Sequence, residues 1–397
     1  MKVLFILPYD IIPANAGNKT LTYNLLKYLT KNIECEIIIL IDNTINSNIL
    51  LEKYRSSFPE LKNLFIYNKP NSLRKFLFKV KYLIKGLHPS LGNFFNSNLK
   101  KFLIKIDNTN EYDLIHFDMI HMAIYKQYIK QTPTLIVASD AYSNASLIAM
   151  SFNKNPFLRL RDYFNTLTLL RIEKLLYPKF NRVCVVSDID KEYLRKNSIN
   201  SNFEQIGIGV SDEFFQAKYY KKDFKGILVL GSLNHKIISE NIVCFLNEIK
   251  KANEKFKIPI TILGKNPSTE ILKCIHENDL ISHIEFVDDF LSFLNNDWVC
   301  VYPQKCGSGL QTKVQQAMAI GLPVLGYSIS FGGLNIINEN NCIIIKNNLE
   351  LCQRSVELAL NEKIRISIGI NAASYIKNKF SISKTGVEML NIYNSVL

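Results

Sequence analysis

The segment of residues 301–333 constrains the fold of this chain more than any other. An apolar run over residues 298–302 is followed by a loop of small residues at positions 307–309 and by a helix-like segment over residues 310–320. That segment stops at Gly321, and a second apolar run starts directly afterwards. A strand, a glycine loop, a helix and another strand in this order indicate a βαβ unit, in which the two strands are parallel.

The loop of this unit has the composition of a phosphate site. Its glycines allow backbone N–H groups to approach an anion, and the amino end of a helix favours negative charge. Lys313 adds a positive charge within the first turn of the helix. Neither a Gly-Lys-Ser/Thr sequence nor a GxGxxG sequence is present here, so the loop is neither a P-loop nor a dinucleotide fingerprint. The alternative for Lys313 is an ordinary solvated lysine on a helix.

Short apolar runs alternate with longer segments of helical period along all 397 residues. This alternation predicts an α/β protein with parallel sheets, and the length suits two domains. Strands are expected at residues 3–7, 36–41, 63–67, 113–117, 134–138, 182–186 and 203–207, and again at 226–230, 259–263, 283–287, 298–302, 323–326 and 342–345. Helices are expected at residues 18–30, 73–85, 120–130, 156–176 and 189–196, and again at 237–253, 267–277, 310–320, 348–360, 363–379 and 384–396.

Residues 207–215 have few long apolar side chains and divide the chain as a linker. The predicted organisation is a first domain over residues 1–208, a second over residues 209–380 and a last helix over residues 381–397. Ligands of open parallel sheets bind beyond the carboxyl ends of the strands. We therefore expect the loop over residues 8–19 and the glycine loop to face a cleft between the domains.

The net charge of +13 is concentrated in the first half of the chain. Residues 1–205 carry +11 of it, and residues 61–106 contain ten basic residues and no acid. This asymmetry favours an anionic partner, such as a membrane surface, a nucleic acid or a phosphorylated acceptor. No aromatic–basic motif of a nucleic-acid-binding module is present, so we do not expect a nucleic-acid partner.

Residues 72–86 combine basic residues with large apolar ones. On a helix the apolar residues cover more than half of the circumference and the basic residues lie at the edges, which is typical of an interfacial helix. We expect residues 72–105 to contact an anionic membrane surface. A domain helix that buries one face and exposes the other is the alternative.

Cysteine usage and hydropathy favour a cytoplasmic protein that is peripheral on the inner face of the membrane. The eight cysteines are scattered without a CxxC pair, so neither disulfides nor a zinc site is expected. No run reaches the roughly 18–20 apolar residues of a membrane span, and the apolar run at the N-terminus is shorter than the ~7–15 residues of a signal-peptide core.

Several acids and histidines in the first half are candidates for a site. Asp140 follows an apolar strand and could act as a general base, or it could cap the next helix. Asp118 and His121 lie at the end of the preceding strand, where a site is expected. His116 lies within that strand, so a core position and a catalytic position are both open.

Two acidic pairs are interpreted as helix starts. Asp188 and Asp190 follow Ser187, and acids in a first helical turn are favoured by the helix dipole. We prefer this to a metal–diphosphate site formed by the DxD sequence. Asp288 and Asp289 have the same interpretation.

The second half carries the segments ILVLGSLNHK, ITILGKNP, IEFVDDF, VYPQKCGSGLQTKVQQAMAIGLPVLG and FGGL in this order, and the first half carries DLIHFD, ASDAYS and VCVVSDIDKEYL. These segments resemble glycosyltransferase family 4, and the resemblance covers most of the chain. It implies the GT-B fold, in which two Rossmann-like domains face a central cleft. It also implies an N-terminal acceptor domain, a C-terminal nucleotide-sugar domain and a C-terminal helix that packs back on the N-terminal domain.

The resemblance further implies a site for a nucleotide-diphosphate sugar. Breaking the bond between sugar and phosphate leaves negative charge on the diphosphate, which fixed dipoles and lysines stabilise, so neither a metal nor another cofactor is expected. The implied donor-binding residues are Gly17, Ser232, Lys236, Val287, Gly307, Ser308, Gly309, Leu310, Gln311, Thr312, Lys313 and Gln316, with residues 286–291 next to the base. Asp140, Asp118 and His121 are the catalytic candidates.

The chain departs from the family at two positions across the loop. Where the family often has two glutamates eight positions apart, this chain has Ser308 and Gln316. An amide can donate to and accept from ribose hydroxyls, so Gln316 can keep that role. Ser308 cannot replace a carboxylate near the transferred sugar.

The predicted function is that of a retaining, metal-independent glycosyltransferase. It would move a hexosyl or related sugar from a UDP- or GDP-sugar to a glycan or lipid-linked acceptor in the synthesis of a bacterial surface polysaccharide, such as lipopolysaccharide or capsule. One alternative is a catalytically degenerate GT-B subunit that binds nucleotide or glycan, which Ser308 and Gln316 motivate. The other is a sugar-nucleotide epimerase, which shares the two-domain plan but needs acid–base side chains near the sugar.

Overall fold

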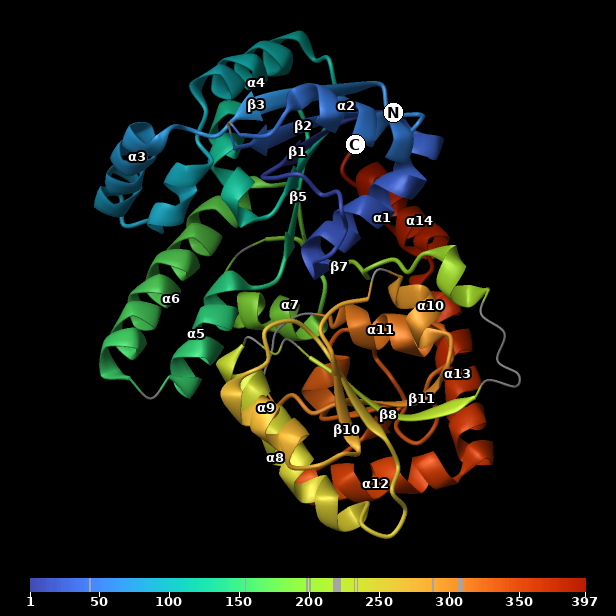
Figure 1. Ribbon diagram of the computed structural model, residues 1–397. Helices are drawn as coiled ribbons and strands as arrows, with labels where there is room; N and C mark the ends of the chain where they lie inside the picture. The colour runs from blue at the N-terminus through green and yellow to red at the C-terminus, as the bar shows by residue number, and fades with distance from the viewer. Residues whose placement is uncertain are drawn as a thin grey trace. The chain divides into compact units, whose positions relative to one another are not determined.

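The computed structural model describes residues 1–42, 44–153, 155–197, 199, 201–216, 223–231, 233, 235–287, 289–305 and 310–397. Contacts within the chain group it into two units, residues 1–209 with residues 382–397, and residues 210–381. Each unit contains one parallel sheet with helices between its strands, as the alternating pattern predicts (Figure 1).

The described part of the first unit contains a seven-stranded parallel sheet with the order β3-β2-β1-β4-β5-β6-β7. Its strands are β1 (Lys2–Leu7), β2 (Glu34–Ile41), β3 (Asn63–Asn68), β4 (Leu114–Asp118), β5 (Thr134–Ser139), β6 (Arg182–Val185) and β7 (Phe203–Gln205). Strand β1 is almost continuously apolar and buried, as a strand covered on both faces must be. It pairs with β2 on one side and β4 on the other. The strand order reverses at this point, and open sheets bind ligands beside such a reversal.

Helices connect these strands, and three further turns are 3₁₀-helical. The α-helices of the first unit are α1 (Gly17–Asn32), α2 (Ser47–Ser57), α3 (Ser72–Ile84), α4 (Ser97–Thr109), α5 (Tyr142–Phe152), α6 (Pro156–Leu176), α7 (Asp188–Lys196) and α14 (Ile382–Asn394). The 3₁₀ segments are η1 (Pro89–Asn93), η2 (Ile120–Tyr128) and η3 (Tyr177–Lys179).

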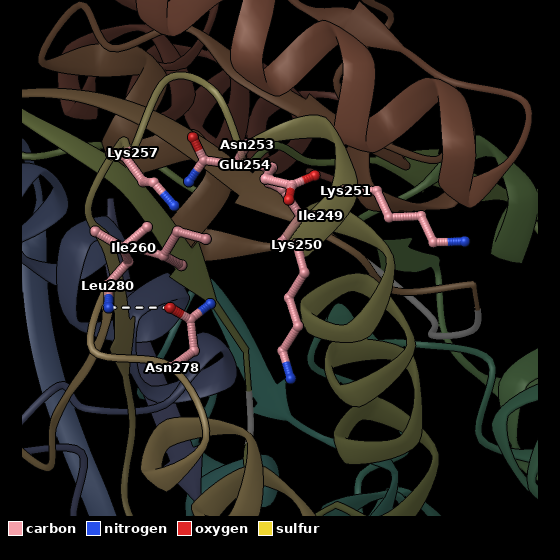
Figure 2. A pocket seen from close by; sticks show the side chains of 9 residues that line it. All are labelled: Ile249, Lys250, Lys251, Asn253, Glu254, Lys257, Ile260, Asn278 and Leu280. Atoms are coloured by element: carbon pink, nitrogen blue, oxygen red, sulfur yellow. Dashed lines mark hydrogen bonds between the residues drawn. The ribbon is translucent and has the colours of Figure 1, made fainter.

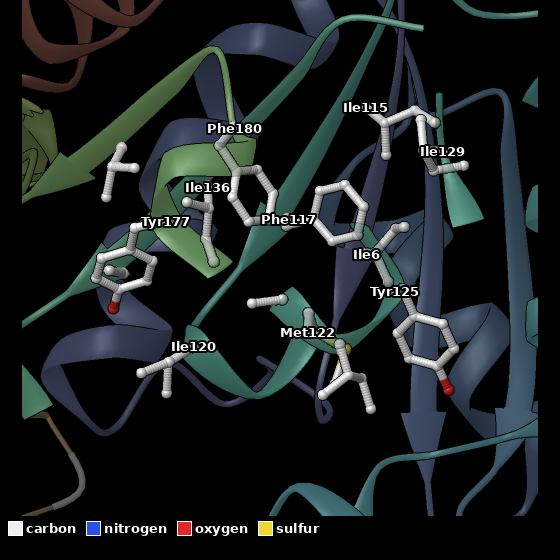
Figure 3. Close-up of a cluster of buried hydrophobic side chains, with 14 of the residues drawn as sticks. Ile6, Ile115, Phe117, Ile120, Met122, Tyr125, Ile129, Ile136, Tyr177 and Phe180 are labelled. Atoms are coloured by element: carbon white, nitrogen blue, oxygen red, sulfur yellow. The ribbon is translucent and has the colours of Figure 1, made fainter. Parts of the chain in front are cut away.

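One core cluster of the first unit lies between its sheet and the segments η2, η3 and α4. Figure 3 shows this cluster, in which Phe117 of β4 lies next to Ile136 of β5 and next to Phe180, the residue after η3. The rings of Phe117 and Phe180 pack edge to face with their centroids 5.3 Å apart. Apolar residues from separate elements thus fix β4 and β5, whose ends carry the acidic candidates.

The C-terminal helix α14 packs against α1 within the first unit. A Cβ atom at Gly386 would lie 2.2 Å from the Tyr28 ring, so only glycine permits this approach. Farther along, the Tyr393 hydroxyl and Nδ1 of His116 share a hydrogen bond of 2.5 Å. His116 is fully buried, and burial lowers its pKa to about 3, so its imidazole is neutral. His116 is therefore a core residue that holds the last helix.

The described part of the second unit contains a six-stranded parallel sheet with the order β10-β9-β8-β11-β12-β13. Its strands are β8 (Phe224–Leu230), β9 (Ile260–Leu263), β10 (Ile281–Ile284), β11 (Asp297–Tyr302), β12 (Val324–Gly326) and β13 (Ile343–Ile344). Its helices are α8 (Lys236–Ala252), α9 (Thr269–His276), α10 (Phe290–Leu294), α11 (Thr312–Ala319), α12 (Asn348–Leu360) and α13 (Glu362–Phe380), with 3₁₀ segments η4 (Asp212–Phe215) and η5 (Ser328–Phe331). Here the order reverses between β8 and β11.

The structure differs from the sequence prediction in several elements. The segment expected to be a helix over residues 120–130 is the 3₁₀ segment η2, which follows Met119 with a φ of 63°. Helices α2, α4 and α5 were not predicted. In α5 the only fully buried side chain is that of Ser143, so its pattern of polarity carries no inward apolar stripe. Strand β10 begins two residues before its predicted start.

Tyr393→Phe tests whether the bond to His116 fastens the last helix. The substitution leaves a buried imidazole nitrogen without its partner, so we expect the free energy of unfolding to fall by about 1–3 kcal/mol. Urea denaturation followed by circular dichroism measures this loss. Tyr23→Phe is the matched control, because no hydrogen bond of the Tyr23 hydroxyl occurs among the described residues. An equal loss in both variants would contradict the assignment.

Candidate functional site

The candidate donor residues of the second unit gather where its strand order reverses. Strands β8 and β11 are neighbours, with Val229 paired to Val301, so the loops that leave them start side by side. Lys236 begins the helix that follows β8, and Lys313 lies in the helix that follows β11. Ser232, Gly307, Ser308 and Gly309 lie outside the described residues.

The amino end of α11 is held against the end of β11 by side chains. The Tyr302 hydroxyl donates to Oε1 of Gln311, the residue before the helix, over 2.6 Å. The Ser330 hydroxyl donates to the carbonyl oxygen of Tyr302 over 3.2 Å. The side chain of Gln311 makes no capping bond to the first turn of α11, and Leu310 is buried beside it. Thr312 is the first residue of the helix, so its first-turn N–H groups need other acceptors.

Lys313 is the second residue of α11 and is half-buried. Burial lowers the pKa of its ammonium group. Among the described residues its ammonium has neither a hydrogen bond nor an ion pair, and the amino end of a helix repels a cation. A bound anion would remove both penalties, so this position favours a phosphate ligand.

Gln304 is a residue that the sequence analysis missed. It lies two residues after β11, is 3% exposed, and its Nε2 has no hydrogen-bond partner in the described chain. A Cβ atom at Gly231, just after β8, would lie 3.6 Å from that nitrogen. A buried amide donor without an acceptor is costly, so a ligand oxygen here would satisfy it. The sequence offered only one signal, the position of Gln304 directly after a strand and Pro303.

The remaining donor candidates have fewer contacts. Lys236 is exposed at the first position of α8. Gln316 is half-buried and lies one turn after Lys313, so both side chains share a face of α11. Val287 is half-buried after β10, next to Phe286, whose exposed ring has the Lys265 ammonium 4.2 Å from its centroid.

In the first unit, candidate residues also follow the neighbouring strands β1 and β4. Gly17 is the first residue of α1, after the β1 loop. Asp118 is the last residue of β4 and is buried, and Thr22 of α1 donates to its carboxylate over 3.1 Å. Burial raises the pKa of Asp118 to about 7, although the Thr22 bond acts in the opposite direction. The Tyr9 hydroxyl of the β1 loop contacts the Met119 sulfur at 2.6 Å, which joins the two loops.

Asp140 lies in the same region, after β5. Burial and the nearby Asp190 carboxylate raise its pKa to about 7. The capping alternative is wrong, because the residue before α5 is Ala141 and the Ser143 N–H of that helix donates to Glu173 over 3.1 Å. No hydrogen bond to the Asp140 carboxylate occurs in the described chain. A half-buried acid of this pKa can accept a proton near neutral pH.

Tyr142 and His121 lie near Asp118 and Asp140. Burial and the charges of Asp140 and Asp118 raise the pKa of Tyr142 well above its usual value, so the phenol stays protonated. The His121 ring meets the Tyr142 ring edge to face at 5.9 Å. Burial, with the charges of His88 and Lys69, lowers the pKa of His121 to about 4, and its Nδ1 has no partner in the described residues. His121 is therefore a neutral hydrogen-bonding group at pH 7.

The acidic pairs in the chain have structural roles where the structure describes them. The Ser187 hydroxyl caps α7 by accepting from the Asp190 N–H, which confirms the predicted helix start. Asp289 likewise caps α10, and Asp288 lies outside the described residues. Within the described ranges, no group of three or more His, Cys, Asp or Glu side chains is placed to hold a metal ion.

A pocket of the second unit lies away from the candidate site. Figure 2 shows a pocket at the amino ends of β9 and β10, the edge of the sheet opposite to α11. Its Asn253 and Asn278 side chains are already bonded to Ile258 and Leu280, so they serve the local backbone. Over the residues that the structure covers, no helix is long and apolar enough to cross a bilayer.

Comparisons with known proteins agree with this geometry. Residues 225–361 match the family "Glycosyl transferases group 1". An uncharacterized glycosyltransferase of Methanocaldococcus jannaschii is 23% identical over 99% of this chain and 98% of its own length. The capsular polysaccharide biosynthesis glycosyltransferase CapM of Staphylococcus aureus is 24% identical over 52% of this chain and 60% of its length. Anabaena HepE, solved in complex with UDP, superposes with a TM-score of 0.67 at 12% identity, with both chains fully covered.

The structural likeness confirms the predicted GT-B fold, with two Rossmann-like domains of parallel strands. The family match lies within the unit that holds Lys313, and the full-length relative is itself described as a glycosyltransferase. The chain is thus a glycosyltransferase.

Asp140→Asn tests the environment of the candidate base. The folded protein keeps the proton of Asp140 up to about pH 7, whereas the unfolded chain releases it near the ordinary pKa of 3.8. Stability from this group therefore falls as the pH rises from about 4 to 7. We expect the variant to be more stable than the wild type above pH 7, by roughly 1–4 kcal/mol, and the difference to vanish near pH 4.

Asp107→Asn is the matched control, with the opposite sign. Burial opposes the charge of Asp107, but backbone N–H groups of Thr132 and Lys130, at 2.9 and 2.7 Å, lower its pKa below the usual value. Its stabilising effect is present above the unfolded pKa and is lost as the pH falls, so this variant loses stability at neutral pH. Urea denaturation from pH 4 to 8 measures both profiles, and two parallel profiles would rule out the assignment.

Proposed function

We propose that this glycosyltransferase moves a sugar from a UDP- or GDP-linked donor to a glycan or lipid-linked acceptor. The half-buried Lys313 at the amino end of α11, which has no hydrogen bond or ion pair among the described residues, is the observation that carries the donor site. The complexes of HepE with UDP and with UDP-glucose support a nucleotide diphosphate as the ligand of such a fold.

In the proposed reaction, the bond between the anomeric carbon and the diphosphate oxygen breaks, and its electron pair goes to the diphosphate. The Lys313 ammonium, the first-turn N–H groups of α11 and the Gln304 amide would stabilise that charge. These groups lead us to propose that the transfer requires no metal. The acceptor hydroxyl bonds to the anomeric carbon and gives up its proton, for which Asp140 is the proposed acceptor.

Retention of the anomeric configuration and membership of family 4 remain proposals from the sequence resemblance. Gln316, on the same face of α11 as Lys313, is proposed to contact the ribose hydroxyls. Lys236, Val287 and Gly17 stay candidate donor contacts, and Asp118 and His121 stay candidates for positioning the acceptor.

The proposed pathway is the synthesis of a bacterial surface polysaccharide. The capsular role printed for CapM of Staphylococcus aureus supports this class of acceptor. Helix α3 exposes Phe76, Leu77 and Leu83 between basic residues, which supports contact of residues 72–105 with an anionic membrane. We therefore propose a cytoplasmic protein that is peripheral on the inner face of the membrane and does not bind nucleic acid.

Thermal denaturation with UDP, GDP or CMP, and with the corresponding nucleotide sugars, tests the donor site. We expect one diphosphate nucleotide to raise the Tm of the wild-type protein by several degrees, because a ligand that binds only the folded state stabilises it. Lys313→Ala should abolish the shift, since it removes the charge that faces the diphosphate. The shift should persist in EDTA if no metal takes part.

Lys363→Ala is the matched control. Lys363 is also the second residue of its helix, α13, but it is exposed. Its removal should leave the nucleotide shift unchanged. No shift with any nucleotide would contradict the proposed donor site. A shift without turnover of the nucleotide sugar would instead favour the degenerate binding subunit.

A further inference from the structure

Helix α6 in the first unit buries several polar side chains and exposes several large apolar ones. Asp162, Thr166 and Glu173 point inward and are buried together with Ile172. The outward side chains of the same helix include Leu160, Phe164 and Leu167, each between 45% and 57% exposed, and Phe157 near its start is 82% exposed. Surface helices normally bury their apolar stripe and expose their polar residues.

The inward face of α6 makes polar contacts with α5 in addition to the packing of Leu169, Leu170 and Ile172 on the core. The Glu173 carboxylate accepts from the Ser143 N–H of α5 over 3.1 Å and also bonds the Ser143 hydroxyl. The Asp162 carbonyl accepts from the Ser146 hydroxyl over 3.1 Å, and its carboxylate bonds Asn153. Helices α5 and α6 therefore form a hairpin that is joined by polar contacts. The apolar stripe of α6 is left for another partner.

The outward stripe of α6 is continuous along several turns. Positions 160, 164, 167 and 171 follow the helical spacing of one face, and Tyr163 lies beside them. Arg171 and Lys174 extend this face toward the end of the helix, and both are exposed. The two acids of α6 are the buried Asp162 and Glu173, so the exposed face has basic charge only.

Helix α3 presents a second face of the same kind. Its exposed apolar residues Leu73, Phe76, Leu77, Val80, Leu83 and Ile84 lie opposite the buried Tyr82. The segment after α3 contacts α6 directly, because His88 Nε2 and Asn165 Oδ1 lie 3.2 Å apart. The two helices are thus neighbours on one side of the first unit (Figure 1).

We infer that the outer face of α6, defined by Phe157, Leu160, Tyr163, Phe164, Leu167, Arg171 and Lys174, is a second membrane-binding element. It would insert its apolar residues into an anionic bilayer beside α3. The inference deepens the proposed membrane contact of α3 and rests on it. Apolar side chains with a basic rim and without exposed acids are complementary to acyl chains under anionic head groups.

A second copy of this chain is a poorer partner for the same surface. Pairing two such faces in either direction would bring basic side chains together, because α6 exposes Arg159 and Arg161 near its start and Arg171 and Lys174 near its end, with no exposed acid of α6 or α3 to oppose them. Like charges across an interface are unfavourable. Phospholipid head groups carry the opposite charge, which decides between the two partners.

Sedimentation with vesicles of phosphatidylglycerol and phosphatidylcholine tests the inference, with pure phosphatidylcholine vesicles for comparison. We expect wild-type protein to bind the anionic vesicles and to bind less at high salt. The double variant Phe164→Ser/Leu167→Ser should bind these vesicles at least about tenfold more weakly than the wild type, because it removes two inserted side chains. Arg171→Gln/Lys174→Gln should weaken only the salt-dependent part.

Leu349→Ser/Leu360→Ser is the matched control, since both leucines are exposed on α12 of the second unit. Its binding should stay within twofold of the wild type. Circular dichroism melts check folding, and Leu160→Ser/Tyr163→Ser serves as a second α6 variant if the first is unfolded.

The outcomes distinguish the role of α6 from the proposed membrane contact of α3 and from the proposed donor site. Loss of binding in Phe76→Ser/Leu77→Ser, with wild-type binding in both α6 variants, would overturn the role of α6 and leave that of α3. Wild-type protein that ignores anionic vesicles would overturn both. Self-association that the α6 variants abolish would assign the face to a second copy. The nucleotide shift in Tm should be the same in all these variants, so it reports on the donor site alone.

Discussion

The desolvation of ionisable side chains is the constraint that the candidate residues of both units share. Lys313 lies half-buried in the first turn of α11, where both burial and the helix dipole oppose its charge. Asp118 and Asp140 lie at the ends of β4 and β5, where burial raises the pKa of each to about 7. Such positions lower stability and persist where a ligand compensates for them.

Sheet topology explains why candidate residues that are distant in sequence lie close together within each unit. In both units the strand order reverses beside the first strand, at β1–β4 and at β8–β11. The loops that leave neighbouring parallel strands there start side by side and have no helix crossing over them. Residues distant in sequence, such as Gly231 and Gln304, consequently meet at one place. The cation of the second unit suits a leaving diphosphate. An acid of the first unit with a pKa near neutral suits an acceptor hydroxyl.

The strands were predictable from sequence because parallel strands buried on both faces form continuous apolar runs. The position of Lys313 in the first turn of a helix was predictable for a related reason, since a loop between a strand and a helix is a local pattern. Contacts between distant segments were not predictable. His116 is fixed by Tyr393, 277 positions away, and Tyr142 lies near the acidic candidates only through the packing of α5. Gln304 was not predicted, because only the folded structure shows that its buried Nε2 has no hydrogen-bond partner among the described residues.

The hairpin of α5 and α6 joins the two proposed activities of the first unit. Helix α5 starts two residues after Asp140, and Glu173 of α6 bonds its first turn. The carboxylate that holds α5 thus belongs to the helix whose opposite side exposes Leu160, Phe164 and Leu167. The two sides of α6 therefore have different roles: its polar contacts hold α5 next to Asp140, and its exposed apolar stripe contacts the bilayer in our proposal. An acceptor anchored in that bilayer would lie beside the helix pair that positions the proposed base.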